Sequence, residues 1–218
     1  IRGSTGFTFG AGNKVLLLLD GVPVYASDTG EFNWDMLPPL ENLCIEVLKG
    51  AGSTLWGASA LGGVVNVITK SPAPGGYLLC SWNAGRYDRP LYREWFWTDQ
   101  SRLHYTREDI SYSRRLGRLG LRLSAGRFNT TGYTQLGDML KFNLTGKMDY
   151  LFPGGITWTL YSAFSRVRRG FFIQWKGPND PYEVDETNLS NYAAVNQLNV
   201  YSKLALPLSS SLVLHLRG

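Results

Sequence analysis

The feature of the sequence that most limits the possible fold is an alternation of apolar and polar residues with a period of two. Residues 140–150, which read LKFNLTGKMDY, carry it most regularly. The same alternation recurs in residues 119–124, 156–165, 198–204 and 212–217. Successive side chains of a β-strand point to opposite faces of a sheet, so each segment is predicted to be a half-buried strand. With the less regular segments 77–84 and 103–114, the prediction reaches about seven strands.

This alternation is compatible with two kinds of β-protein. A membrane barrel around water or a plug is apolar outside and polar inside, whereas a soluble β-sandwich has the opposite arrangement. Several segments are close to the 9–11 residues with which a tilted strand crosses a bilayer. A short turn at Pro153–Gly155 and a long predicted loop over 166–190 fit the alternating turns and loops of an outer-membrane barrel. The pattern by itself does not choose between the two.

Composition narrows the function classes without deciding the fold. Charged residues make up 18% of the chain, below the roughly 25% of typical soluble domains. The net charge is +5, but Lys and Arg are scattered, so a nucleic-acid site is not predicted. No apolar run approaches the ~20 residues of a membrane helix, and no signal peptide is recognisable. Cys44 and Cys80 form no CxxC motif, so they predict no metal site and leave a disulfide open.

No catalytic residue is predicted. The segment Gly50–Ser53 lacks the Lys and the spacing of a phosphate-binding loop. Gly57–Leu61 lacks the final Gly of a nucleophile elbow. His104 and His215 are isolated in strand-like segments, without a partner in any motif. The acidic stretch 180–186 is expected to be a solvated loop, with calcium binding or contact with a cationic cargo as the alternatives.

The character of the sequence changes at residues 71–76, which read SPAPGG. Two prolines and two glycines do not continue a strand or helix, so this segment is predicted to be a linker. Before it, residues 14–20, 44–48 and 64–68 are predicted to be short buried strands, and 39–42 a short helix after Pro38.

Three stretches of the first 70 residues resemble the plug of TonB-dependent outer-membrane transporters. They are IRG at residues 1–3, LLDGVPV at 18–24, and IEVLKGAGSTLWGASALGGVVNVITK at 45–70. The resemblance covers about a third of the chain, and the later segments match the barrel in style only. It implies a mainly β fold, with a mixed-sheet plug domain (C-terminal part) at 1–70 and a linker at 71–76. Residues 77–218 would then be the N-terminal strands of an antiparallel transmembrane β-barrel, that is, a partial barrel.

The resemblance also implies a latch between plug and barrel. The basic plug residues of the family that pair with acids on the inner barrel wall correspond by position to Arg2 and Lys49, and Glu46 lies in the same motif as Lys49. Arginine is the commoner residue at the second position, and lysine lacks its two-pronged donor geometry. The acidic partners are expected on later strands. The alternative is that both cations are simply solvated.

Glycines of the plug motif are expected where the backbone turns tightly or approaches another strand. These are Gly21, Gly50, Gly57, Gly62 and Gly63.

The loop over residues 25–35 is implied to face the external vestibule, where family members contact cargo. Tyr25, Phe32 and Trp34 are therefore candidates for contact with an apolar or aromatic cargo. Packing of these aromatic side chains against the barrel wall is the alternative.

The function implied by the resemblance is TonB-dependent uptake of a scarce cargo across the outer membrane of a Gram-negative-type bacterium, with the plug gating the barrel. The cargo would be an iron–siderophore, haem, cobalamin or a similar molecule, and no cofactor, resident metal or catalysis is expected. The expected partners are outer-membrane lipid and the inner-membrane protein TonB, bound through a segment upstream of residue 1. A passive or adhesive barrel and a soluble ligand-binding β-sandwich are the alternatives. Because a barrel around a plug needs roughly twenty strands, the natural polypeptide is expected to be longer at both ends.

Overall fold

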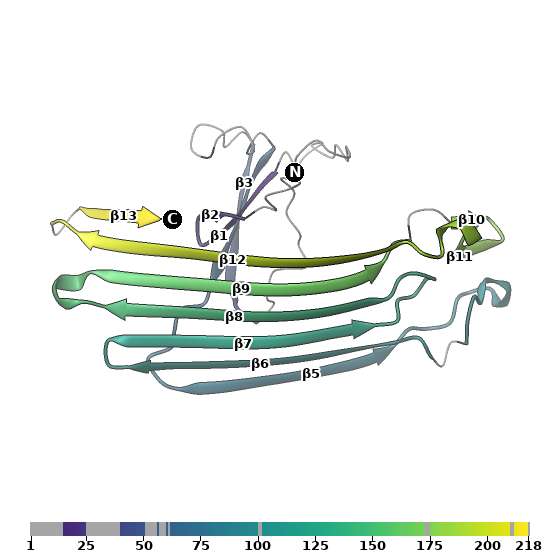
Figure 1. The fold of residues 1–218 in the computed structure, drawn as a ribbon, viewed down its shortest axis with the longest axis horizontal. Helices are drawn as coiled ribbons and strands as arrows, with labels where there is room; N and C mark the ends of the chain where they lie inside the picture. Colours follow the sequence, from purple (N-terminus) through teal and green to yellow (C-terminus); the bar gives the residue numbers. More distant parts are fainter. Residues whose placement is uncertain are drawn as a thin grey trace.

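The computed structural model describes residues 15–24, 40–50, 56, 60, 62–99, 102–172, 175–209 and 212–217. Within these ranges the chain forms a four-stranded sheet and a seven-stranded sheet, and Figure 1 shows the strands of the smaller sheet running steeply across those of the larger one. No helix in the described ranges is long and apolar enough to span a membrane.

The smaller sheet, here called the mixed sheet, has the strand order β2-β1-β4-β3. Its strands are β1 (Val15–Leu19), β2 (Val22–Pro23), β3 (Asn42–Lys49) and β4 (Gly63–Thr69). β1 and β4 are parallel, whereas the other two pairs are antiparallel. The three strands expected from the first part of the sequence are present, each within a few residues of its predicted bounds. β1 and β4 are buried as predicted, but the predicted burial is wrong for β3, which lies at the edge of the sheet and is mostly exposed.

The predicted helix over 39–42 is wrong for the part that the structure describes. Leu40 and Glu41 form a turn, and Asn42 already belongs to β3. The reason is tertiary: the Glu41 carbonyl accepts a hydrogen bond from the Lys70 amide, at 2.7 Å, which closes the end of the β3–β4 ladder. A helical turn at this position would withdraw that carbonyl from β4.

The larger sheet, here called the wall, is an antiparallel meander in the order β13-β12-β9-β8-β7-β6-β5. Its strands are β5 (Tyr77–Arg86), β6 (His104–Leu116), β7 (Leu119–Thr130), β8 (Met139–Leu151), β9 (Thr157–Gly170), β12 (Tyr192–Pro207) and β13 (Val213–Arg217). All seven predicted strands are present. A separate hairpin pairs β10 (Trp175–Gly177) with β11 (Asp180–Val184).

The predicted loop over 166–190 is partly wrong. β9 continues to Gly170, and the hairpin β10–β11 occupies part of the remainder. The charged run around Arg166 and Arg168 resembles a loop, but these arginines are exposed and flank the buried Val167. The strand alternation therefore continues through the charges.

The two ends of the wall differ in their connections (Figure 1). At one end the strands are joined by the short segments 117–118, 152–156 and 208–212, and we call this the turn end. At the other end the longer segments 87–103, 131–138 and 171–191 join them, and we call this the loop end. The mixed sheet is connected to β5 at the turn end, through residues 70–76.

The mixed sheet packs on one face of the wall. Leu17, Leu19, Val65 and Val67 form a buried cluster with Tyr161, Ala163 and Tyr201 of the wall. The rings of Tyr161 and Tyr201 are stacked, with centroids 4.9 Å apart. The opposite face of the mixed sheet is apolar too, and there Leu16, Leu18 and Val64 pack with Ala60. The alternation within β1 thus supplies two apolar faces, only one of which lies on the wall.

Candidate functional site

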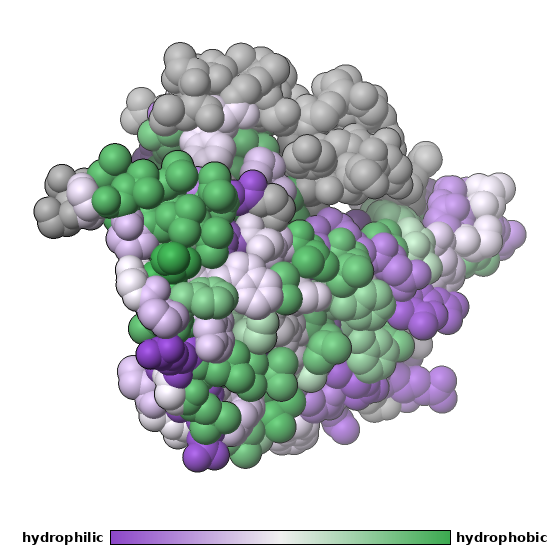
Figure 2. Space-filling view, turned by 60° about the vertical axis from the view of Figure 1, so that its left-hand side comes forward, coloured by the Kyte–Doolittle hydropathy of each residue, from purple (hydrophilic) through white to green (hydrophobic). Residues whose placement is uncertain are grey.

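The wall buries its polar face and exposes its apolar face. Side chains that face the mixed sheet include Ser111, Arg122, Thr145 and Asp149, and all of these are buried. On the opposite face, large apolar side chains are exposed: Ile110, Leu123, Phe142, Leu144, Phe164, Leu198 and Val200. In Figure 2 hydrophobic residues cover a broad part of the visible surface, and hydrophilic residues gather toward the right-hand side. A water-soluble sandwich would present these faces the other way round.

The first of two charged contacts between the sheets centres on Asp20, in the tight turn after β1. One carboxylate oxygen accepts from the Thr69 amide at 2.8 Å. The other accepts from the Thr69 hydroxyl at 2.5 Å, from Lys147 Nζ at 3.2 Å and from the Tyr201 hydroxyl. Lys203 donates to the Asp20 backbone carbonyl. We call these five residues the Asp20 network, in which three groups of the wall bind one acidic turn of the mixed sheet.

The pKa of Asp20 lies below its ordinary value. Burial by itself would raise the pKa, but the hydrogen bonds from Thr69 and Tyr201 and the charge of Lys147 together outweigh it. The carboxylate therefore stays ionised at neutral pH, as its ion pair with Lys147 requires.

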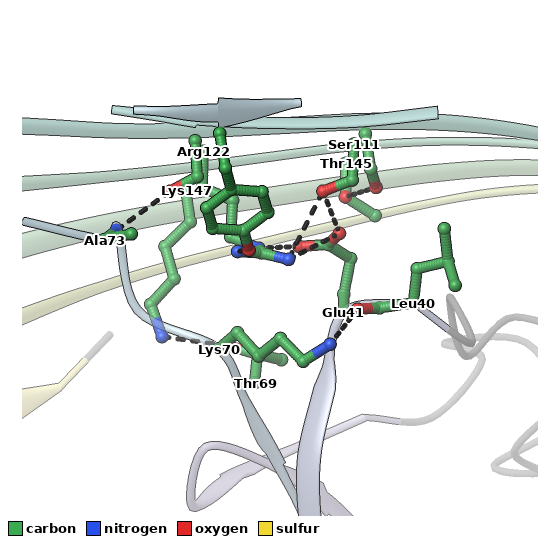
Figure 3. Close-up of polar contacts among 12 residues, drawn as sticks. Leu40, Glu41, Thr69, Lys70, Ala73, Ser111, Arg122, Thr145 and Lys147 are labelled. Atoms are coloured by element: carbon green, nitrogen blue, oxygen red, sulfur yellow. Dashed lines mark hydrogen bonds and ion pairs between the residues drawn. The ribbon is translucent and has the colours of Figure 1, made fainter. Parts of the chain in front are cut away.

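The second charged contact centres on Glu41, in the turn before β3 (Figure 3). The Glu41 carboxylate is bound by Nε and Nη2 of Arg122 and by the Ser111 hydroxyl, the last at 2.9 Å. Nη1 of Arg122 donates to the Tyr77 hydroxyl, and the guanidinium carbon lies 5.4 Å from the centre of the Tyr77 ring. The Arg122 and Glu41 side chains are only 2% and 4% exposed. We call these four residues the Glu41 network.

The guanidinium and the carboxylate of the Glu41 network satisfy each other in a two-pronged geometry, which is the arrangement that makes burial of two charges tolerable. Two further bonds hold the adjoining backbone. Lys70 Nζ donates to the Leu40 carbonyl at 2.7 Å, and the Ser113 hydroxyl accepts from the Ala73 amide at 2.9 Å. The linker is thereby fixed to the wall next to the ion pair.

The two networks distribute their charges between the sheets in the same way. In each, the mixed sheet contributes the carboxylate, from Asp20 or Glu41, and the wall contributes the cation, from Lys147 or Arg122. Both cations lie on the polar face of an alternating strand, so the sequence predicts that they lie on the polar face of the sheet. Glu41 was missed, because it follows a Pro-rich turn and belongs to no alternating segment.

Residues 1–64 match the family described as TonB-dependent Receptor Plug Domain. The ferric enterobactin receptor PirA of Pseudomonas aeruginosa is 39% identical over 69 aligned residues, which cover 27% of this chain and 9% of that protein. Residues 1–64 are therefore a plug domain of the TonB-dependent receptor type, and the chain is similar to that receptor family.

Solved receptors have the same fold. A mutant of the ferric enterobactin receptor PfeA of P. aeruginosa, in complex with enterobactin, matches with a TM-score of 0.66 at 17% identity, covering 90% of this chain and 31% of the receptor. The pyoverdine receptor FpvA of P. aeruginosa gives 0.69 at 16% identity, covering 97% and 30%. The siderophore receptor PiuA of Acinetobacter baumannii gives 0.68 at 13% identity, covering 96% and 29%. At these identities the likeness establishes the fold alone: a plug and barrel strands.

These comparisons support the predicted family resemblance and confirm the predicted fold class. The chain spans about a third of the length of these three solved receptors. The relatives are receptors and not enzymes, which agrees with the absence of a catalytic prediction. Within the described ranges there is no group of three or more potential metal ligands among His, Cys, Asp and Glu.

The predicted latch residues occupy other positions than the two networks. Arg2 lies outside the described residues. Lys49 is exposed at the end of β3, and Glu46 is exposed on the same strand, where it accepts from Asn66 Nδ2 at 3.0 Å. In the described part of the receptor neither Lys49 nor Glu46 forms an ion pair, so their role as a latch stays a prediction.

Three of the motif glycines have backbone angles that favour glycine. They are Gly21 at φ +77°, Gly50 at φ +97° and Gly63 at φ +134°. Gly21 has a second task, because its amide donates to Asn66 Oδ1 at 2.9 Å and so closes the turn that carries Asp20. Gly62 precedes β4, and Gly57 lies outside the described residues.

The cargo-contact candidates Tyr25, Phe32 and Trp34 also lie outside the described residues. The structure brings together other aromatic side chains at the loop end of the wall. Ring contacts with centroids 4.5–6.1 Å apart connect Tyr87, Tyr92, Trp95, Tyr105, Tyr133 and Tyr182. Sequence reasoning missed this cluster, because its members come from three separate loops and the strand ends next to them.

The pKa of one tyrosine in the aromatic cluster is well above its ordinary value. A hydrogen bond with the Tyr182 hydroxyl, together with partial burial, raises the pKa of Tyr133 to about 12. The Tyr133 carbonyl also accepts from Trp97 Nε1 at 3.1 Å. The Tyr133 phenol is therefore neutral at physiological pH and can both donate and accept a hydrogen bond.

The two cysteines and the acidic loop were the remaining candidates for a disulfide or a metal site. Cys44 and Cys80 are free and exposed, so the disulfide left open by the sequence is not formed. In the acidic loop, Glu183 and Asp180 pair with Lys176 at 3.0 Å and 3.9 Å, so a lysine of the same hairpin balances part of the acidic charge.

Proposed function

We propose that this chain supplies the plug and the first barrel strands of a receptor that takes up a ferric siderophore across the outer membrane, driven by TonB. Residues 1–70 form the C-terminal part of the plug, 71–76 are the linker, and 77–218 are the N-terminal barrel strands. The plug closes the barrel at rest, and TonB pulls it from the wall to admit cargo. The chemistry is binding and displacement, without bond making.

The observation that carries this proposal is the inverted polarity of the wall. Its apolar face is exposed, and its polar face is covered by the mixed sheet through the Asp20 and Glu41 networks. An apolar outer face suits contact with lipid, and a polar inner face suits a lumen that contains either plug or water. Membrane location follows from the same arrangement and is part of the proposal.

The chemistry of the interface also suits a plug that moves. A buried ion pair adds little net stability, because the desolvation of both charges offsets most of their attraction. It does fix a unique seat, since Arg122 is satisfied only where Glu41 meets it. When the plug is displaced, Arg122 and Lys147 are left on a wall that water can reach, and both regain hydration. An interface of this kind is specific at rest and separable under force.

A ferric siderophore is proposed as the cargo because the curated relative with 39% identity over part of the plug is a ferric enterobactin receptor. Siderophores that carry aromatic hydroxyl groups would suit the aromatic cluster at the loop end, which offers ring faces and hydroxyl groups for hydrogen bonds.

The test is uptake of radiolabelled ferric enterobactin by cells that carry the full-length receptor as their sole siderophore receptor, with and without TonB. We expect uptake that needs TonB, while binding at 0 °C does not need it. Haem and cobalamin serve as competing cargoes. Uptake that persists without TonB would favour a passive barrel, and solubility of the purified receptor without detergent would favour a soluble sandwich.

A matched pair of variants connects the test to the interface. Bifunctional maleimide cross-linking of cysteines at Thr69 and Lys147, in a background with Cys44→Ser and Cys80→Ser, ties the plug to the wall across the Asp20 network. Binding should persist while uptake stops. The uncross-linked double variant is the control, and unchanged uptake after complete cross-linking would contradict plug displacement at this position.

A further inference from the structure

The exposed face of the wall carries a groove about midway along its strands. The groove has a volume of about 590 Å³ and is lined by apolar side chains of adjacent strands, among them Ile110, Ala125, Leu144 and Phe164. These four residues are direct cross-strand neighbours along β6, β7, β8 and β9. Ala125 is much smaller than its direct neighbours Ile110 and Leu144, so the row is hollowed at β7. The size and lining suit a hydrocarbon chain.

A row of cations borders the groove on the side of the loop end. The next outward-facing cross-strand row reads Glu108, Arg127, Phe142 and Arg166, and Arg168 follows on β9. All three arginines are exposed. Arg127 and Arg166 stand on either side of Phe142, so their Cα atoms are about 10 Å apart, which is two strand spacings.

These arginines are only partly neutralised by the protein. Arg127 pairs with Glu108 at 3.1 Å, and Arg168 lies 5.6 Å from the centre of the Tyr192 ring. Charged side chains on the face of a barrel that meets lipid are costly in the apolar band and are tolerated near the headgroups. In the proposed membrane location, the row would therefore lie at the level of the lipid phosphates. Among the described residues, Arg166 and Arg168 have no ion-pair partner.

We propose that this groove and its arginine row form a binding site for a phosphorylated glycolipid of the outer leaflet. An acyl chain lies in the groove over Ala125, and phosphate monoesters lie on Arg127, Arg166 and Arg168. The loop end is the external end of the wall, because external loops of outer-membrane barrels are longer than the turns on the other side. A doubly ionised phosphate suits three clustered guanidinium groups better than a zwitterionic headgroup does.

This inference rests on the proposed membrane location of the wall, but it does not depend on cargo or on TonB. The test is native mass spectrometry of the full-length receptor in detergent, titrated separately with lipid A, phosphatidylglycerol and phosphatidylethanolamine. We expect lipid A to bind most tightly. Since no cargo is present, a failure of the uptake experiment leaves this measurement interpretable.

Two pairs of variants locate the site. Changing Arg127, Arg166 and Arg168 to Gln should weaken lipid A binding on the order of a hundredfold, at roughly fivefold per arginine. Arg114→Gln, on the same exposed face at the turn end, should leave it unchanged. Ala125→Phe should fill the groove and weaken binding about tenfold or more, whereas Leu121→Phe, on the same strand outside the groove, should not.

Three results would overturn the proposal. One is lipid A binding unchanged in the triple arginine variant, and another is phosphatidylethanolamine binding as tightly as lipid A. The third is a dimer of the receptor that Ala125→Phe abolishes, because the groove would then hold a second copy of the chain. Migration of each variant as a folded, heat-modifiable barrel on gels excludes misfolding as the cause of lost binding.

Discussion

The two faces of the wall come from the same strands, yet they obey opposite rules. On the inner face Arg122, Ser124 and Thr145 are buried, and on the outer face Leu123 and Leu144 are exposed. In a soluble protein the leucines would form the core. The comparison shows that the buried face of a sheet need not be its apolar face. In the proposed receptor, the inner face is polar because it meets the plug and water, and the outer face is apolar because it meets lipid.

The largest expected effect comes from breaking the inner face at its most buried pair. Glu41→Gln leaves the Arg122 guanidinium buried without a counter-charge, which costs about 3–5 kcal/mol in the free energy of unfolding. Urea titration of the full-length receptor in detergent, followed by protease cleavage of the plug, measures the change.

The double variant Glu41→Met with Arg122→Leu is the control for this experiment. It removes both charges and should recover most of the loss, because well-packed apolar residues can replace a buried pair. Equal urea midpoints for the wild-type receptor and Glu41→Gln would show that the ion pair is solvated and not buried.

The next largest effect is expected when a charge is placed on the apolar outer face. Leu123→Arg puts a charge among exposed apolar side chains and should cost about 2–4 kcal/mol in a bilayer if this face meets lipid at depth. Asn129→Arg, on the same side of the same strand near the loop end, should cost about 1 kcal/mol or less. Reversible unfolding of the receptor in lipid vesicles measures both. Equal costs at the two positions would mean that the exposed face is not set in lipid as described.

A smaller effect distinguishes the Asp20 network by its pH dependence. Because the pKa of Asp20 is lower in the folded state, its contribution to stability is complete above its ordinary value of 3.8. That contribution disappears as the pH falls through the folded pKa. Asp20→Asn should therefore cost about 2 kcal/mol at pH 7, and the difference from wild type should close below pH 3.8. The stability difference is measured by urea titration across pH 3–7, and a gap that is constant over this range would exclude Asp20 as the titrating group.

The smallest effect is expected for a substitution on the β10–β11 hairpin, outside both faces of the wall. Lys176 is exposed on the β10–β11 hairpin, where its hydrogen bond with Glu183 raises the lysine pKa. Exposed pairs contribute little because water screens them. Lys176→Met should leave the Tm of the receptor unchanged in calorimetry. A clear drop in Tm would show that the acidic hairpin packs on something more than solvent.

Much of the local structure could be predicted from the sequence alone. Period-two alternation gave seven strands, and the turn after Asp20 and the Pro–Gly break at 71–76 follow from backbone preferences of single residues. The plug motif at residues 45–70 gave the family. Each of these depends on neighbours in the chain, which is why the sequence sufficed. The helix over 39–42 failed for the opposite reason, because a hydrogen bond from Lys70 decided it.

What the tertiary structure alone decided is which face of the strands is covered and which charges meet. Alternation is unchanged when its two faces are exchanged, so no strand states in its own sequence whether its polar side looks into a lumen or into solvent. Arg122 and Glu41 are 81 residues apart in the chain, and Lys147 and Asp20 are 127 apart. Nothing local to any of these four residues specifies a partner, because the pairing depends on the angle at which the mixed sheet crosses the wall.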